Sequence, residues 1–233
     1  MADRNGLSKP GRSPLTQTAG PDLNKGGCAA LTGPARQVHL AALTAFAQTG
    51  RAPTRGDLER SARAEGAYPA AVLAGLAERD VIAFDQAGEI RAAYPFSPSP
   101  TPIRVSREGG PVTYAMCAID ALGISAMLGR PVTITAAEPG TGRVIAVHAD
   151  RDRARWDPPR AVVFAGTTGG DRCHAADRTC GYINFFTTAR AARAWARANP
   201  AVTGTLMSQA RALSAGVAEF GAFMQTGDGP TQP

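Results

Sequence analysis

Apolar residues recur at helical spacing in three short segments in the first half of the chain, and a stretch of alternation follows them. The helical segments span residues 35–50, 54–66 and 69–79. Gly50 is a typical end for the first segment, and Thr54 with Asp57 three residues later is the pattern of an N-cap for the second. Residues 81–94 then alternate around a glycine turn, which predicts a hairpin.

Three short helices followed by a hairpin are typical of a winged-helix-like module, which we assign to residues 34–95. Such modules place one helix in the major groove of DNA. The third segment would be that helix, but it consists mostly of Ala, Leu and Val, and its charged residues Glu78 and Arg79 stand at its end. Because base edges are read by Arg, Lys, Asn or Gln, we expect this module to have a packing role and no nucleic-acid partner.

A proline-rich segment separates the helical module from the rest of the chain. Residues 95–102 hold four prolines, which disfavour helices and central strands, so residues 96–102 are predicted to form a semi-rigid linker. Helices are predicted beyond it over 115–128, 189–197 and 202–223. Strands are predicted over 103–105, 112–114, 131–136, 143–148, 161–165 and 182–186. Residues 103–225 should therefore form an α+β domain with mixed or antiparallel strands and helices on one side.

The composition of the chain predicts a disordered tail and a cytoplasmic location. Residues 1–33 are rich in Gly, Pro, Ser, Thr and Asn without any hydrophobic period, which predicts a disordered tail. No apolar run reaches the roughly 18 residues of a membrane span, and the start of the chain does not resemble a secretory signal. We therefore expect a cytoplasmic protein with reduced thiols and no membrane partner. The net charge of +6 is only a weak signal for a nucleic-acid partner, because the chain has only two lysines and its arginines are scattered.

Cys117 and Asp120 form the first candidate site. They stand three positions apart in a predicted helix, so their side chains should lie on the same face, about one turn apart. A thiol and a carboxylate at that spacing can share a proton. Cys117 could equally be a small core residue, whereas a buried aspartate in a helix is unfavourable unless it has a partner.

The other cysteines carry weaker signals. Cys173, His174 and Cys180 could supply three zinc ligands, with His148 as a fourth, but their spacing is not that of a structural zinc knuckle. Thiolates from two distant segments, one of them beside a carboxylate, suit a soft metal that is handled transiently. Cys28 lies in the predicted tail and is expected to be an incidental thiol.

Two motifs around these cysteines carry a family resemblance. The first is Thr113-Tyr-Ala-Met-Cys117-Ala-Ile-Asp120-Ala-Leu-Gly-Ile, with Leu128-Gly-Arg-Pro-Val and a Thr141-Gly142 turn after it. The second is Cys180-Gly-Tyr-Ile-Asn-Phe-Phe, followed by Trp195. Both are similar to the motifs of the alkylmercury lyases, or organomercurial lyases. The helical module and the proline-rich crossing fit that family too, so the resemblance covers about residues 35–225.

The resemblance implies that residues 103–225 are a catalytic domain that cleaves carbon–mercury bonds by protonation. The products would be a hydrocarbon and Hg(II), released as part of mercury detoxification and without an organic cofactor. Cys117 and Cys180 would capture mercury as thiolates, and Asp120 would carry the proton and join them in holding the Hg(II) product transiently. The implied partners are an organomercurial substrate and, as acceptors of Hg(II), exogenous small thiols or a mercuric reductase.

Three positions depart from the family pattern. A structural cysteine of well-known members has no counterpart here, and Glu138 stands near where it would lie. Gly181 stands where a second Cys or a His often follows the catalytic cysteine, and Met116 stands where well-known members often have Trp. These changes bear on substrate preference more than on the reaction. The Cys173-His174 pair looks like part of an added loop that could hand metal on or off.

Two other classes of function remain open from the sequence. The first is a non-catalytic, thiol-based protein that binds or senses metal, which would take up an organomercurial stoichiometrically instead of turning it over. The second is a transcriptional regulator that uses the winged helix, for which salt-dependent duplex binding would be required.

Overall fold

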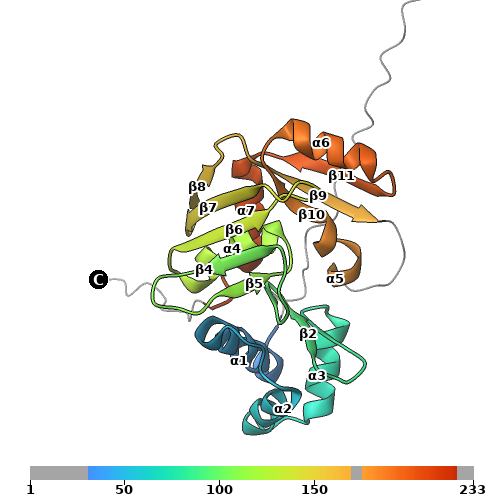
Figure 1. Ribbon diagram of the computed structural model, residues 1–233. Helices are drawn as coiled ribbons and strands as arrows, with labels where there is room; N and C mark the ends of the chain where they lie inside the picture. Colours follow the sequence, from blue (N-terminus) through green and yellow to red (C-terminus); the bar gives the residue numbers. More distant parts are fainter. Residues whose placement is uncertain (1–30, 169–174, 225–233) are drawn as a thin grey trace, which may run out of the picture.

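Two antiparallel sheets and seven α-helices make up the part of the protein that the computed structural model describes, residues 31–168 and 175–224 (Figure 1). The helices are α1 (Gly33–Thr49), α2 (Arg55–Ala64), α3 (Pro69–Glu78), α4 (Ala118–Leu128), α5 (Ala175–Arg178), α6 (Ala189–Ala198) and α7 (Gln209–Phe220), with a 3-10 turn at Cys180–Tyr182. The strands are β1 (Ile82–Phe84), β2 (Ile90–Ala93), β3 (Phe96–Ser97), β4 (Ile103–Ser106), β5 (Thr113–Ala115), β6 (Val132–Ala137), β7 (Val144–Asp150), β8 (Arg153–Asp157), β9 (Val162–Thr168), β10 (Ile183–Phe186) and β11 (Val202–Met207). The mixed α+β class is thus confirmed.

The three helices predicted at the beginning of the chain form, and their ends follow the predicted signals. Thr54 and Asp57 make a reciprocal capping box at the start of α2, with the Thr54 Oγ1 accepting from the Asp57 N–H at 3.2 Å. Gly50 ends α1 in the left-handed conformation, with φ of 72°. A side chain at Gly50 would also meet the Val112 carbonyl oxygen, 2.7 Å from an ideal Cβ, so α1 ends tightly against the loop before β5.

The larger sheet runs without interruption from the helical module into the rest of the protein. Its eight strands follow the order β1-β2-β3-β5-β4-β6-β7-β8. The crossing strand is β3, in which Phe96 pairs with Ala93 on one side and Ala115 on the other. Phe96 is fully buried and stacks on Phe46 of α1 with ring centroids 5.2 Å apart.

The predicted linker over 96–102 is therefore wrong at its beginning, where a buried strand stands. The prolines on either side do not prevent it, because Pro95 and Pro98 flank the Phe96–Ser97 pair and leave the N–H groups of the strand itself intact.

Near the C-terminus the predicted helix over 202–223 is also wrong. Its first part is β11, which pairs with β9 along its whole length, and only Gln209–Phe220 is helical. Gly204 lies where an added Cβ would be 2.3 Å from the Ala165 carbonyl oxygen, so the two strands approach closely. Ser208 then starts α7 by accepting a hydrogen bond from the Arg211 N–H. Strand β8, whose Trp156 is buried, was not predicted.

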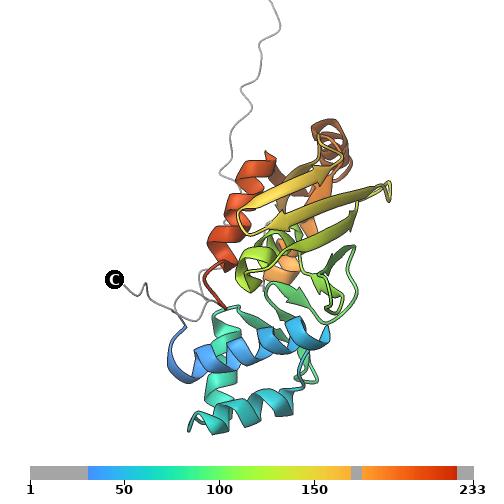
Figure 2. The same cartoon turned by 90° about the vertical axis from the view of Figure 1, so that its left-hand side faces the viewer.

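Helix α4 is buried almost all round, between the large sheet and α7 (Figures 1 and 2). The two helices touch at a pair of glycines. An ideal Cβ on Gly123 would be 2.5 Å from the carbonyl oxygen of Gly216, and one on Gly216 would be 2.7 Å from the Gly123 nitrogen. Only glycine permits this approach, so the two helices pack backbone against backbone.

Some predictions lie outside the described residues, and one about membranes can be checked within them. The proposed tail up to residue 30, with Cys28, and the Cys173-His174 pair are not described. Within residues 31–168 and 175–224, every helix is too short or too polar to cross a bilayer.

Glu138, at the end of β6, ties the two sheets together. Its carboxylate is 2% exposed and accepts hydrogen bonds at 2.6 Å from both the backbone N–H and the hydroxyl of Thr187, the residue after β10. The Thr141 hydroxyl donates at 2.7 Å, and the Arg143 guanidinium lies 3.1 Å away. Burial by itself would raise the pKa of Glu138, but the hydrogen bonds from Thr187 and Thr141 and the charge of Arg143 outweigh it and leave that pKa below 4.5.

Replacing Glu138 with Gln should therefore lower stability in a pH-dependent way. A depressed carboxyl pKa stabilises the fold above the unfolded value of 4.5 and loses that contribution as pH falls through the folded value. At pH 7 we expect Glu138→Gln to lower the free energy of unfolding by about 1.5–3 kcal/mol, the usual range for hydrogen bonds to a charged group. The difference from wild type should narrow below pH 4.5. Urea unfolding across this range measures it, with the exposed Glu65→Gln as control. An equal loss at every pH would contradict the assignment.

His39 of α1 is the second buried ionisable group of interest. It is 3% exposed, and its ring meets Phe223 edge-on with centroids 5.7 Å apart. Within the described residues, its Nε2 has no hydrogen-bond partner. Burial lowers the pKa of His39 from 6.5 to about 4, opposed in part by a hydrogen bond to the backbone of Tyr94.

His39 should make the fold less stable as pH falls from 6.5 to 4. In this window the unfolded chain binds the proton and the folded protein does not, so up to about 3 kcal/mol is lost. His39→Leu removes this term, and its stability should fall less than that of wild type between pH 7 and 4.5. Urea unfolding at these two pH values tests it, with the exposed His148→Leu as the matched control. Equal pH dependence in wild type and His39→Leu would show that His39 is protonated in the fold.

Candidate active site

Cys117 is the N-cap residue of helix α4, directly before its first helical residue. Its backbone is extended, with φ of −154° and ψ of 176°, and its Sγ accepts a hydrogen bond from the Asp120 N–H at 3.4 Å. The sequence-based helix over 115–128 therefore started too early, because residues 113–115 pair as β5 and the helix starts at Ala118. The sulfur occupies the N-cap position, where the unpaired N–H groups and the helix dipole favour a thiolate.

Asp120 lies in the first turn of the same helix and is fully buried. We expected an unfavourable residue in a helix interior, but the first turn is where a negative charge is stabilised by the dipole. The carboxylate also has a thiol beside it, since Cys180 Sγ donates to Asp120 Oδ2 at 3.9 Å. Cys117 and Asp120 are therefore close, as their spacing predicted, but they meet at the N-terminus of the helix and not along one of its faces.

Cys180 reaches this site from a distant part of the chain. It lies 60 positions after Asp120, in the 3-10 turn that joins α5 to β10, and is 2% exposed. The strand that follows is fixed by antiparallel pairing with β9 and by Phe185, whose ring packs against Trp156 of β8 with centroids 5.6 Å apart. The smaller sheet thus positions Cys180 against α4.

The three predicted site residues come together in one buried cluster. One sulfur from each cysteine and one carboxylate oxygen of Asp120 all lie within 4.8 Å of one another. Two thiolates that share one metal ion need such a separation, given metal–sulfur bonds of about 2.3 Å for a soft ligand such as cysteine on zinc. Two sulfurs and one carboxylate, out of contact with bulk water, can bind a soft metal and exchange a proton.

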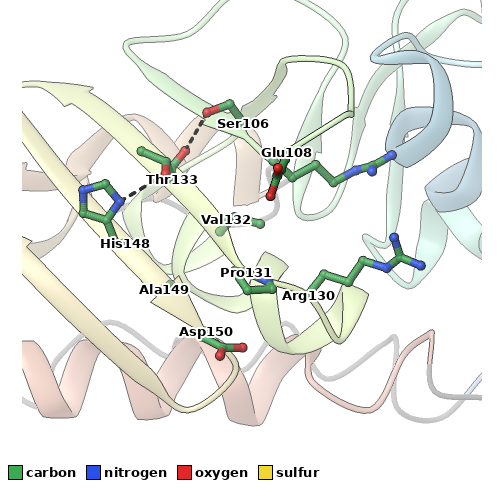
Figure 3. Close-up of a pocket in the computed structure, with 10 residues that line it drawn as sticks. Ser106, Glu108, Arg130, Pro131, Val132, Thr133, His148, Ala149 and Asp150 are labelled. Carbon is green, nitrogen blue, oxygen red and sulfur yellow. Dashed lines mark hydrogen bonds between the residues drawn. The ribbon is translucent and has the colours of Figure 1, made fainter.

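The alternative zinc site is not supported among the described residues. His148 lies on β7 with its ring exposed and its Nδ1 3.2 Å from the Thr133 Oγ1. It faces a surface hollow of about 830 Å³ beside the end of β4, the start of β6 and the end of β7, which Arg130, Glu108 and Asp150 also line (Figure 3). The residues that accompany Cys180 are Cys117 and Asp120 instead.

Two side chains that the sequence analysis did not single out lie next to the segment before Cys180. Asp80 accepts a hydrogen bond from the Ala175 N–H, and the Tyr94 hydroxyl accepts one from the Ala176 N–H. Neither residue belongs to a motif, and both lie in the helical module, far from Cys180 in the chain. No local pattern could have connected them with the site.

Comparisons with known proteins agree with this geometry. Residues 96–221 match the family model of the alkylmercury lyases. An alkylmercury lyase of Streptomyces lividans is 28% identical over 173 residues, which are 74% of this chain and 78% of that protein. One from Staphylococcus epidermidis is 29% identical over 119 residues, which are 51% of this chain and 54% of that protein.

A solved structure shares the fold. The mercury-bound form of MerB2 superimposes with a TM-score of 0.70 at 24% identity, over 87% of this chain and 97% of that chain. The family match covers more than half of the chain and contains Cys117, Asp120 and Cys180. On these grounds the chain belongs to the alkylmercury lyase family of enzymes.

Proposed function

We propose that this enzyme cleaves the carbon–mercury bond of organomercurials with Cys117 and Cys180 as mercury-binding thiolates and Asp120 as the proton carrier. The observation that supports this most directly is the buried cluster in which the two sulfurs and the carboxylate lie within 4.8 Å of one another. The family match supports the type of reaction, and the cluster supports the assignment of its steps to these three side chains.

Cys117 is suited to capture the substrate. Its Sγ at the N-terminus of α4 is held by the Asp120 N–H, and a thiolate there displaces the ligand that accompanies the organomercury cation. The new sulfur–mercury bond would hold the mercury beside Asp120 and Cys180.

Cys180 and Asp120 are suited to move the proton. The Cys180 Sγ lies 3.9 Å from Asp120 Oδ2 and can donate to it, so the proton can pass to the carboxylate while the sulfur binds mercury as a second thiolate. The protonated Asp120 then donates this proton to the carbon, the electron pair of the carbon–mercury bond forms the new carbon–hydrogen bond, and the hydrocarbon leaves. Hg(II) stays on the two sulfurs.

Release completes the cycle. Two exogenous thiolates, from small cellular thiols or a mercuric reductase, would take Hg(II) from Cys117 and Cys180, and Cys180 would regain a proton from solvent. Every proton and ligand in this scheme comes from the chain, the substrate, thiols or water, so we propose no organic cofactor. Burial of all three groups keeps the proton from being lost to water before it reaches carbon.

The N-terminal part would serve this chemistry as a cover. Helices α1–α3 and the β1–β2 pair follow the order of elements expected for a winged-helix-like module. They pack on the same core as the site through Phe46 and Phe96. We propose that the module, over residues 34–95, closes the site and does not bind nucleic acid. We propose that the enzyme acts in the cytoplasm as part of mercury detoxification.

The non-catalytic metal-binding alternative is less well supported. A protein that only holds Hg(II) needs the two thiolates, but it does not need a fully buried carboxylate within reach of a thiol proton. The position of Asp120 is therefore what favours an enzyme.

Replacing Asp120 with Asn should separate capture from cleavage. The variant keeps both sulfurs and the side-chain shape but cannot carry the proton, so it should still bind phenylmercury while releasing benzene at least about a hundredfold more slowly than wild type. Bound mercury is measured by mass spectrometry and benzene by gas chromatography, with excess cysteine present. Cys117→Ser should lose capture as well, and Cys28→Ser serves as the matched control. Release of benzene at the wild-type rate by Asp120→Asn would remove Asp120 from the mechanism.

A further inference from the structure

The short helix α5, which leads to Cys180, has its N-terminus held by the helical module. The Ala175 N–H donates to Asp80 Oδ2 at 2.7 Å, and the Ala176 N–H donates to the Tyr94 hydroxyl at 2.8 Å. The first N–H groups of a helix have no partner inside it and are usually capped by a neighbouring residue. Here the acceptors come from more than 80 positions earlier in the chain.

Asp80 and Tyr94 form one acceptor pair. The Tyr94 hydroxyl donates its single hydrogen to Asp80 Oδ1 at 3.5 Å, so its oxygen can accept from the Ala176 N–H. Tyr94 is fully buried. Asp80, the second residue after α3, has a φ of 52°, a left-handed conformation that aspartate adopts more easily than most residues but that still costs energy. A backbone held in this state brings the carboxylate to α5.

The held segment continues directly into the site. Both the N–H and the hydroxyl of Thr179 donate to the Ala175 carbonyl at 3.0 Å, and the Tyr182 N–H donates to the Thr179 carbonyl at 2.8 Å. Cys180 lies between these two turns. Its position therefore depends on where α5 begins, whereas Cys117 is fixed separately by α4, whose first turn includes Asp120.

We propose that Asp80 and Tyr94 are positioning residues for Cys180, holding its sulfur at the distance from Cys117 and Asp120 that mercury binding and proton transfer require. This inference rests on the proposed function. It gives the helical module a task beyond covering the site, because two of its side chains determine where one of the two mercury ligands lies.

The test uses Tyr94→Phe, which keeps the buried ring and removes only the hydroxyl. The matched control is Tyr68→Phe, because Tyr68 belongs to the same module and is 75% exposed. Each full-length protein is treated with iodoacetamide under native conditions, and alkylation of Cys180 and Cys117 is followed separately by peptide mass spectrometry. Thermal unfolding and phenylmercury cleavage with excess cysteine are measured on the same samples.

For Tyr94→Phe we expect Cys180 to be alkylated at least about tenfold faster than in wild type, with Cys117 changed less than twofold, and kcat for cleavage to fall about tenfold. Cys117 serves as an internal control, since general loosening of the fold exposes both buried thiols together. Parallel acceleration at the two cysteines, or no change at Cys180, would overturn the proposal. Faster alkylation of Cys180 with unchanged cleavage would support the positioning and contradict instead the catalytic role of Cys180.

A second pair of variants separates the Asp80 carboxylate from its backbone. Asp80→Gly fits the left-handed conformation but removes the acceptor, and Asp80→Asn fits it while keeping an amide oxygen for the Ala175 N–H. We expect Asp80→Gly to reproduce the selective alkylation of Cys180 and the loss of kcat, and Asp80→Asn to restore most of both. Equal behaviour of the two variants would overturn the role of the acceptor.

Discussion

The contact of α4 with α7 at Gly123 and Gly216 is the constraint on which the rest of the site depends. A helix that touches the sheet on one side and another backbone on the other cannot slide or rotate without a clash. Its first turn is therefore fixed in space, and Cys117 and Asp120 are fixed with it. Cys117 and Asp120 are therefore placed by a helix that is packed on both sides, and not by a loop.

Cys180, the second of the two proposed mercury ligands, is positioned in a different way. Cys180 depends on a short turn between α5 and β10, with the smaller sheet after it and the helical module before it. The site thus has two parts: Cys117 and Asp120 lie on the rigid helix α4, whereas Cys180 lies in a turn that is supported from several sides. Such a division suits a reaction in which one sulfur must bind first and the other must give up its proton afterwards.

The sequence was most informative where local chemistry decides the structure. The capping box of Thr54 and Asp57 and the alternating hairpins were predictable because each is specified within a few residues. The strand over 112–114 was predicted, but the start of α4 was not, because residues 115–117 are apolar enough to continue the helix backwards. Only the pairing of Ala115 with Phe96 of β3 places it in β5. Cys117 as N-cap was equally hidden, since cysteine is not a typical capping residue. Spacing predicted that Cys117 and Asp120 would be close. It marked Cys180 only as a candidate metal ligand; the family resemblance placed it with Cys117 and Asp120, and long-range strand pairing brings it there.

The two-residue strand β3 has a consequence for how this protein can be divided. The family match begins at residue 96, which is also where β3 begins, so a gene fragment cut at that boundary would begin with this strand. It would lack β2, and with it one hydrogen-bonded neighbour of β3, and it would expose Phe96, which α1 covers in the whole chain. An apolar edge strand of that kind is a template for pairing between molecules. Expressed without its first 95 residues, the part that carries Cys117 and Cys180 would be expected to aggregate.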